Sequence, residues 1–227
     1  MISLIQFPYS PYCIVQRRLL EYSGARFKLV NVPNADRSLV WKLTKERYYQ
    51  VPVLQDGRTI LFETEEDSQV IAKYLDERFK LGLFPAEWEG IQTLLWRHFE
   101  GEVESFTFKI NDTHWRDVVP KRERLGFVRH KERKFGRGCL ERWEAEKPAL
   151  YAGLAAALQP AENMLATRPF LLTDRPLFSD FCLFGMLGNL LYSGQESIPA
   201  SCPRLVDWYR RMGAIQRPSE ALSKKRG

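Results

Sequence analysis

Hydrophobic residues in the first third of the chain follow two spacings, one typical of strands and one typical of helices. Four short apolar runs rich in β-branched residues predict strands, which cover residues 2–7, 27–32, 51–54 and 59–62. Three segments with apolar residues at helical spacing predict helices, which begin at residues 11, 38 and 67. Asp56-Gly57 separates the last two strands and is typical of a hairpin turn. The order β-α-β-α-β-β-α predicts a mixed sheet with helices on its faces.

The pattern changes after residue 79. Residues 80–89 contain Gly82 and Pro85 and predict a linker, and from residue 90 to about Met212 the apolar spacing is helical throughout. The predicted helices cover residues 90–110, 116–147, 149–166, 179–192 and 203–212. We therefore expect an α/β domain over residues 1–79, a linker over 80–89 and an all-helical domain over 90–227.

Composition favours an ordinary globular protein. Of the 227 residues, 44% are hydrophobic and 27% are charged. No apolar run approaches the roughly 20 residues that span a bilayer, and the first residues are typical of a strand rather than a signal peptide, so we expect a cytoplasmic protein without membrane contact. The four cysteines and three histidines are scattered, which predicts reduced thiols and no metal site.

A net charge of +6 points to acidic ligands or to nucleic acid. Residues 127–139 interleave basic and aromatic side chains, which is a pattern found in proteins that bind single strands. Glutamates lie among these charges at helical spacing, however, and this favours a solvated, salt-bridged helix face. We therefore do not expect a nucleic-acid partner, and strongly salt-dependent binding to DNA or RNA would be needed to revive that alternative.

The first chemical motif is Tyr9-Ser10-Pro11-Tyr12-Cys13, where a predicted strand turns into a helix with Pro11 at its first position. The free N–H groups and positive dipole end of a helix stabilise a thiolate. A Ser10 hydroxyl at this place can donate a hydrogen bond to a bound thiolate, and the alternative is a plain N-cap. For Cys13 there are two interpretations. It is a buried thiol, or it is a functional residue that forms mixed disulfides with a thiol ligand.

Two further motifs suit a peptide-like ligand. In Gln50-Val51-Pro52, a cis bond before Pro52 would let the backbone of Val51 pair with a peptide, whereas the alternative is a trans proline at a sheet edge. Asp67 suits an ammonium group, and the Ser68 hydroxyl with the N–H groups of a helix start suits a carboxylate. Together they match the head group of an α-amino acid, and the alternative is an N-cap pair without a ligand.

In this order the three motifs resemble those of the cytosolic glutathione transferase superfamily, over roughly the first 80 residues. Ser10-Pro11-Tyr12-Cys13, followed by Arg17, is similar to the start of the tau- and theta-like serine enzymes of bacterial style. It also resembles a glutaredoxin Cys-Pro-Tyr-Cys motif whose first Cys is replaced by Ser. Further on, residues 175–181 resemble the buried helix start of the second domain, with Asp180 as the capping acid and Leu177 where the family usually has Ser or Thr.

The resemblance implies a thioredoxin-like α/β N-terminal domain, an all-α C-terminal domain and a homodimer. It implies a glutathione S-transferase, active in detoxification, in which glutathione is the co-substrate and its thiolate attacks a small hydrophobic electrophile. The residues implied to bind glutathione are Ser10, Gln50, Val51, Pro52, Asp67 and Ser68, with Ser10 as the catalytic hydroxyl and with Cys13 and Tyr9 as alternatives. Candidates for the glycyl carboxylate are Arg37, Lys42 and Lys45. Candidates for the electrophile site are Tyr9, Tyr12, Phe106, Phe108 and Trp115.

Two other functions stay open for this fold. One is a binding or interaction module without catalytic activity, since fold does not imply function. The other is a glutathione-dependent thiol transferase that uses Cys13.

Overall fold

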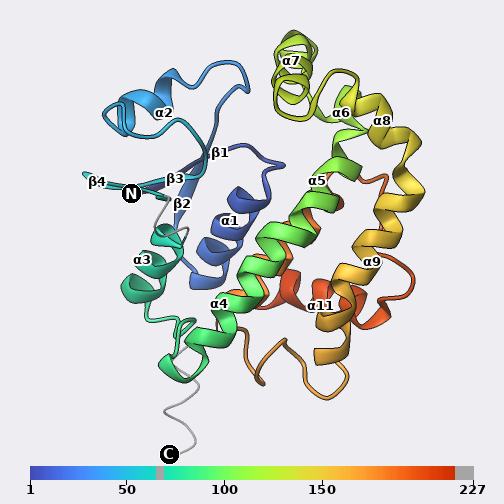
Figure 1. The fold of residues 1–227 in the computed structure, drawn as a ribbon. Coiled ribbons are helices and arrows are strands. Elements are labelled where there is room, and N and C mark those ends of the chain that lie inside the picture. The colour runs from blue at the N-terminus through green and yellow to red at the C-terminus, as the bar shows by residue number, and fades with distance from the viewer. Residues whose placement is uncertain (65–68, 218–227) are drawn as a thin grey trace, which may run out of the picture.

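The computed structural model describes residues 1–64 and 69–217 and contains a four-stranded mixed sheet (Figure 1). The strands are β1 (Ile2–Gln6), β2 (Phe27–Asn31), β3 (Val53–Asp56) and β4 (Thr59–Phe62), in the order β2-β1-β3-β4. β1 pairs with β2 in parallel and with β3 antiparallel, and β3 forms a hairpin with β4. The mixed sheet expected from the β-α-β-α-β-β-α pattern is therefore confirmed.

Three helices cover this sheet: α1 (Pro11–Ser23), α2 (Ser38–Leu43) and α3 (Val70–Phe79). Side chains along a strand point alternately to its two faces, so Leu4 packs with α1 and α3, and Ile5 packs on the side of α2. α1 begins at Pro11 as the sequence predicts, and it ends at Gly24, whose φ of 72° is the left-handed conformation that favours glycine. The predicted start of α3 at Asp67-Ser68 lies outside the described residues. We call β1–β4 with α1–α3 the sheet unit.

The remaining chain is helical, and we call it the helical unit (Figure 1). After a 3₁₀ turn at Ala86–Trp88, α4 (Glu89–His98) continues through a π-helical turn (Phe99–Val103) into α5 (Glu104–Asp112). The later helices are α6 (Trp115–Val118), α7 (Arg124–Phe135), α8 (Cys139–Ala145), α9 (Lys147–Met164), α10 (Phe178–Leu190) and α11 (Pro203–Ala214), with a 3₁₀ turn at Lys121–Glu123. None of the helices in the described part of the chain is long and apolar enough to cross a membrane.

The prediction of one long helix over residues 116–147 is wrong. The segment is divided into α6, a 3₁₀ turn, α7 and α8. Pro120 follows the extended Val119 and cannot continue a helix, and Gly136 and Gly138 have φ values of 89° and 70°. These breaks place α7 beside α6 and on the same side of the molecule as the loop after β2 (Figure 1).

α10 is the centre of the helical unit, because all of its residues are buried. Its first turn is capped by Asp180, whose carboxylate accepts hydrogen bonds from the backbone N–H groups of Leu177 and Leu171 and from the Trp208 indole, each at 3.0 Å. The backbone carbonyl of Leu177 accepts a hydrogen bond from the Asp180 N–H at 3.0 Å. The leucine side chain cannot accept one, so the cap lacks the second side-chain hydrogen bond of a capping box. Burial raises the pKa of Asp180 to about 6.

Two glycines let α10 pack closely against α1 across the boundary of the two units. A Cβ on Gly185 would lie 2.3 Å from Cγ2 of Val15 and 2.6 Å from the backbone oxygen of Pro11. A Cβ on Gly188 would lie 3.0 Å from Cγ2 of Ile14. The first turn of α1 is therefore positioned directly by α10.

Arg18 links α1 to the C-terminal end of α11. Its side chain is buried, Nε donates to the backbone oxygen of Met212 at 2.7 Å, and Nη2 donates to the oxygen of Ile215. These two carbonyls lie at the C-terminal end of α11, where the last carbonyls of a helix have no hydrogen-bond partner within the helix.

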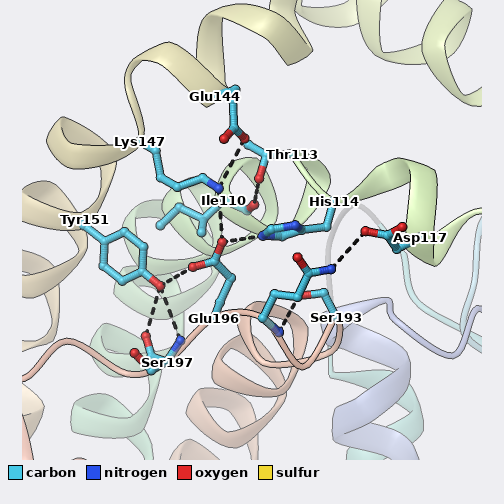
Figure 2. Close-up of polar contacts among 11 residues, drawn as sticks. Ile110, Thr113, His114, Asp117, Glu144, Lys147, Tyr151, Ser193, Glu196 and Ser197 are labelled. Carbon is cyan, nitrogen blue, oxygen red and sulfur yellow. Dashed lines mark hydrogen bonds and ion pairs between the residues drawn. The ribbon is translucent and has the colours of Figure 1, made fainter.

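A polar cluster around Glu196 fixes the loop that follows α10 (Figure 2). Tyr151 of α9 donates to Oε2 of Glu196 at 2.6 Å, Lys147 lies 3.2 Å from Oε1, and His114 also contacts Oε1. Burial raises the pKa of Glu196, but the hydrogen bonds from these three side chains outweigh it, so the net effect lowers the pKa. The carboxylate is therefore held ionised between α9, α10 and the α5–α6 turn.

Candidate functional site

A cavity of about 780 Å³ lies between the two units. The sheet unit contributes the turn from β1 into α1, the loop after β2 and residues 49–51. The helical unit contributes α5, α7 and Asn189 of α10. Since chain segments far apart in the sequence meet here, the cavity is the natural place for a small-molecule ligand.

Ser10 lies at the edge of this cavity and directly precedes α1. Its backbone is extended, with φ −65° and ψ 127°, and its carbonyl accepts the N–H of Ile14 at 2.9 Å. The Ser10 side chain makes no capping bond to the helix backbone. A hydroxyl and the positive end of a 13-residue helix therefore meet at one point of the cavity.

Cys13 lies one turn further along α1, outside the cavity lining. Its side chain is fully buried in the cluster that includes Val40, Val51 and Val53. Burial raises the pKa of the Cys13 thiol to about 11, although hydrogen bonds from the Ser10 side chain and the Phe7 backbone act in the opposite direction. The thiol is therefore protonated at neutral pH, which disfavours its use as a nucleophile.

Tyr9 lines the cavity and is fixed from several sides. Its ring stacks on Phe7 with centroids 5.7 Å apart and meets Tyr192 edge-on at 5.8 Å. Asn34 donates to its hydroxyl oxygen, and Asn189 donates to its backbone oxygen at 2.8 Å. Burial raises the pKa of Tyr9, so the phenol stays protonated and is available as a hydrogen-bond donor.

The Val51–Pro52 peptide bond is cis, which is one of the two alternatives that the sequence left open. Gln50 and Val51 line the cavity, whereas Pro52 is buried behind them. Asp67 and Ser68 lie outside the described residues. The described residue that follows them, Gln69, donates from Nε2 to Oε1 of Glu100 at 2.9 Å and so links this segment to the helical unit.

Of the basic residues considered for a carboxylate, only Arg37 is part of the described cavity lining; Lys42 and Lys45 are not. The Arg37 guanidinium lies 4.0 Å from the ring centroid of Phe7 and donates to the backbone oxygen of Tyr49 at 3.2 Å. These contacts hold an arginine in the wall that the sheet unit contributes to the cavity.

Helix α7 forms the second wall. Its side chains Arg129, His130, Arg133 and Lys134 are exposed, as expected for a solvated face, but the expected ion pairs along the helix itself are not formed among its described residues. Its residues His130, Lys131, Arg133 and Lys134 line the cavity. Lys131 pairs with the buried Asp112 of α5 at 2.5 Å, and its ammonium lies 4.7 Å from the ring centroid of Phe108. Burial raises the pKa of Asp112, and Lys131 opposes that rise. The interleaved basic and aromatic residues of this segment were the sequence signal for the wall. Their spacing alone could not show that they line a cavity.

Contacts between α7 and the loop after β2 close one side of the cavity, and Figure 1 shows α7 on the same side of the molecule as this loop. The backbone N–H of Asn34 donates to Oε2 of Glu123 at 2.7 Å, just before α7 begins. A Cβ on Gly126 would lie 3.5 Å from the Cβ of Ala35. The cavity is therefore bounded by both units rather than open along its whole length.

Three of the aromatic residues suggested for a second substrate line the cavity, namely Tyr9, Tyr12 and Phe108. Phe106 and Trp115 do not: Phe106 packs on Gly153 of α9, and Trp115 lies beneath Arg116. Sequence reasoning missed Asn189, which is 2% exposed and whose Oδ1 has no hydrogen-bond partner. The described residues contain no group of three His, Cys, Asp or Glu that could hold a metal ion.

Two protein families match this chain. Residues 4–82 match the N-terminal domain of glutathione S-transferases, and residues 140–211 match their C-terminal domain. A comparison with curated protein sequences found no match.

Solved structures show the same fold at low sequence identity. A glutathione transferase of Phanerochaete chrysosporium is 18% identical with a TM-score of 0.76, over 94% of this chain and 96% of that one. A glutathione S-transferase of Ceriporiopsis subvermispora, solved with glutathione, is 21% identical with a TM-score of 0.75 over the same shares. Glutaredoxin 2 of Salmonella typhimurium, also solved with glutathione, is 17% identical with a TM-score of 0.72, over 95% and 96%.

Proposed function

The chain belongs to the glutathione transferase superfamily, and from that premise we propose that it transfers the glutathione thiolate to a small hydrophobic electrophile. The observation that carries this proposal is the position of Ser10. Its hydroxyl and the start of α1 lie at a cavity of about 780 Å³ that aromatic side chains of both units line. Similar structures from Ceriporiopsis subvermispora and Salmonella typhimurium contain glutathione, which supports the choice of ligand.

Glutathione has groups that suit each part of this cavity. The backbone of Val51 is available to its cysteinyl unit. The Arg37 guanidinium can bind its glycyl carboxylate by charge-assisted hydrogen bonds. We assign its γ-glutamyl end to Asp67 and Ser68, whose types suit an ammonium group and a carboxylate. Gln50 and the buried Pro52 complete the loop that borders the peptide.

Ser10 acts on the sulfur. When the thiol loses its proton to solvent, the Ser10 O–H donates to the thiolate and the dipole of α1 stabilises the negative charge, so the thiol pKa falls. The thiolate then forms a C–S bond with the electrophile, and the leaving group departs with the bonding electron pair. Tyr12 and Phe108 hold the electrophile beside the sulfur.

Thiol transfer through Cys13 is the second enzymatic function considered, and the similarity to a glutaredoxin speaks for it. The buried position of Cys13 and its raised pKa of about 11 speak against it. We therefore assign the chemistry to Ser10.

We also propose a homodimer. α4 exposes Ile91 and Leu94, which lie three residues apart on one face and are 45% and 64% exposed. Light scattering after size exclusion should give a dimer for the wild type and a monomer for Leu94→Glu. A monomeric wild type would contradict the proposal.

The test of the transferase function combines binding and turnover. Calorimetry should give a micromolar to low-millimolar Kd for glutathione, and conjugation to 1-chloro-2,4-dinitrobenzene should be measurable by absorbance. Ser10→Ala removes one hydrogen bond to a charged sulfur, worth about 1.5–3 kcal/mol, so kcat/KM should fall by roughly 10- to 100-fold. Its pH profile should shift upward, because the thiol pKa rises. Ser105→Ala, on the exposed side of α5, is the matched control.

No glutathione binding at several millimolar would contradict the proposal. Binding without turnover of any electrophile would instead favour a non-catalytic module of the same fold.

A further inference from the structure

The cavity beside Ser10 carries a surplus of positive charge. Among the residues that the structure describes, its lining contains four permanently cationic side chains, Arg37, Lys131, Arg133 and Lys134, and two carboxylates, Glu104 and Asp112. The same lining contains aromatic rings from both units, among them Tyr12, Phe108 and Phe135. A purely hydrophobic second substrate would use the rings and leave the charges without a role.

The cations of α7 are not equivalent. Lys131 is already paired with the buried Asp112 at 2.5 Å. Within the part of the chain that the structure describes, neither Arg133 nor Lys134 forms an ion pair with a carboxylate. Among the described residues, Arg133 donates a hydrogen bond to Nδ1 of His130, at 3.5 Å. Because Arg37 is assigned to the glycyl carboxylate of glutathione, these two side chains are the cations of the described lining that are left for a second ligand.

His130 reports the resulting positive field. Burial lowers the pKa of this imidazole first, and the repulsion of four neighbouring cations lowers it further. Glu104 is the opposing group, since it also lines the cavity; burial raises its pKa to about 6, and the attraction of Lys131 and Lys134 acts against that rise. One carboxylate that is itself only partly exposed does not balance two unpaired cations.

We infer that the second substrate is a planar aromatic electrophile that carries an anionic group, such as a carboxylate or a sulfonate, which Arg133 and Lys134 bind. The inference deepens the proposed function and rests on it for the position of the reacting sulfur. The ring of the substrate stacks among Tyr12, Phe108 and Phe135, while its anion lies against α7. In a substitution such as that of 4-chloro-3-nitrobenzoate, the thiolate forms the C–S bond, chloride leaves with the bonding electron pair, and the thiol proton goes to solvent.

Binding tests this inference without any turnover. The fluorescent probes are 8-anilinonaphthalene-1-sulfonate and N-phenyl-1-naphthylamine, which share one ring system and differ in the sulfonate. The sulfonate should bind at least tenfold more tightly to the wild type, and its affinity should fall as NaCl rises, whereas the neutral probe should be insensitive to salt. The variant Arg133→Gln/Lys134→Gln should lose about tenfold in affinity for the sulfonate alone.

Two further variants sharpen the result. Glu104→Gln removes the opposing charge and should tighten sulfonate binding, an effect that a structural defect would not produce. Arg129→Gln, which removes a cation of α7 outside the cavity lining, should change nothing. In assays of turnover, Arg133→Gln/Lys134→Gln should raise the KM for 4-chloro-3-nitrobenzoate. It should not change the KM for 4-chloro-3-nitrobenzamide or for glutathione.

Equal affinity for the two probes would overturn the inference, and so would a sulfonate preference that survives in Arg133→Gln/Lys134→Gln. A rise in the KM for glutathione in that variant, with sulfonate binding unchanged, would assign the cations to glutathione and would also overturn it. A different result would contradict the proposed transferase function alone. In that case neither chloronitro compound is turned over, while the preference for the sulfonate probe and its dependence on Arg133 and Lys134 remain.

Discussion

Replacing Gly185 by alanine tests whether α10 positions the first turn of α1. The added Cβ would lie 2.3 Å from Cγ2 of Val15 and 2.6 Å from the backbone oxygen of Pro11. Val15 can change its rotamer, at a cost of about 0.5–1.5 kcal/mol, but the Pro11 oxygen recedes only if α1 moves. Ordinary contact begins near 3.4 Å, so the backbone must shift by several tenths of an ångström.

The expected size of the effect follows from two opposing contributions. Overpacking of this kind costs about 1–3 kcal/mol, and the better helix propensity of alanine returns about 1 kcal/mol. We therefore expect the free energy of unfolding to fall by up to about 2 kcal/mol and Tm to fall by up to about 8 °C. Because the displaced Pro11 adjoins Ser10, glutathione conjugation should also fall, on the order of tenfold.

Urea unfolding followed by tryptophan fluorescence measures the first effect, and kcat/KM for 1-chloro-2,4-dinitrobenzene measures the second. The matched control is Gly213→Ala in α11, whose Cβ would meet nothing closer than Phe184 at 4.0 Å. That variant should be slightly stabilised and fully active. A Gly185→Ala protein as stable and as active as this control would refute the close packing of α1 on α10.

Three other substitutions have defined outcomes. Cys13→Ala should keep conjugation activity, and iodoacetamide at pH 8 should label wild-type Cys13 slowly by mass spectrometry, because the thiol is buried and its pKa is about 11; loss of activity would favour thiol transfer instead. Glu196→Gln should lower the free energy of unfolding at pH 7 by about 2–4 kcal/mol. Since the folded state lowers the pKa of Glu196, this contribution to stability is present above the pKa of the unfolded chain and is lost as pH falls through the pKa of the folded state. Urea unfolding should therefore show a smaller difference in the free energy of unfolding between the wild type and Glu196→Gln at pH 3.5 than at pH 6. Lys131→Met should cost about 3–5 kcal/mol by leaving Asp112 buried without its partner, and adding Asp112→Asn should recover much of that loss; strict additivity in the double variant would argue against the pair.

Much of the sheet unit could be predicted from the sequence because its signals are local. Pro11 and Gly24 mark the ends of α1 through backbone conformation alone, and Asp56-Gly57 sets the hairpin in the same way. The position of Ser10 follows directly from the predicted start of α1. The isomer of the Val51–Pro52 bond could not be predicted, since it depends on the packing around it.

The second wall of the cavity could not be predicted because it depends on contacts between distant residues. Periodicity gave the helical character of residues 116–147 but not the turns at Pro120 and Gly136, which decide where α7 lies. The glutamates of this segment indicated i,i+4 pairing, yet Lys131 pairs with Asp112 of another helix. Asn189 carries no local signal at all, because its role comes from the packing of α10 against the β1–α1 turn.

Arg18 has a consequence for the order in which this protein is made. The backbone oxygen that its Nε binds belongs to Met212, 194 residues further along the chain. At a synthesis rate of roughly 5–20 residues per second, the arginine waits on the order of 10–40 s for that carbonyl. The face of α1 that packs on Gly185 and Gly188 is likewise without its cover until α10 has been synthesised. The sheet unit is synthesised first, but the contacts of α1 with α10 and with Met212 form only after those residues have been made, so the nascent chain does not reach the native state before Met212 has been synthesised.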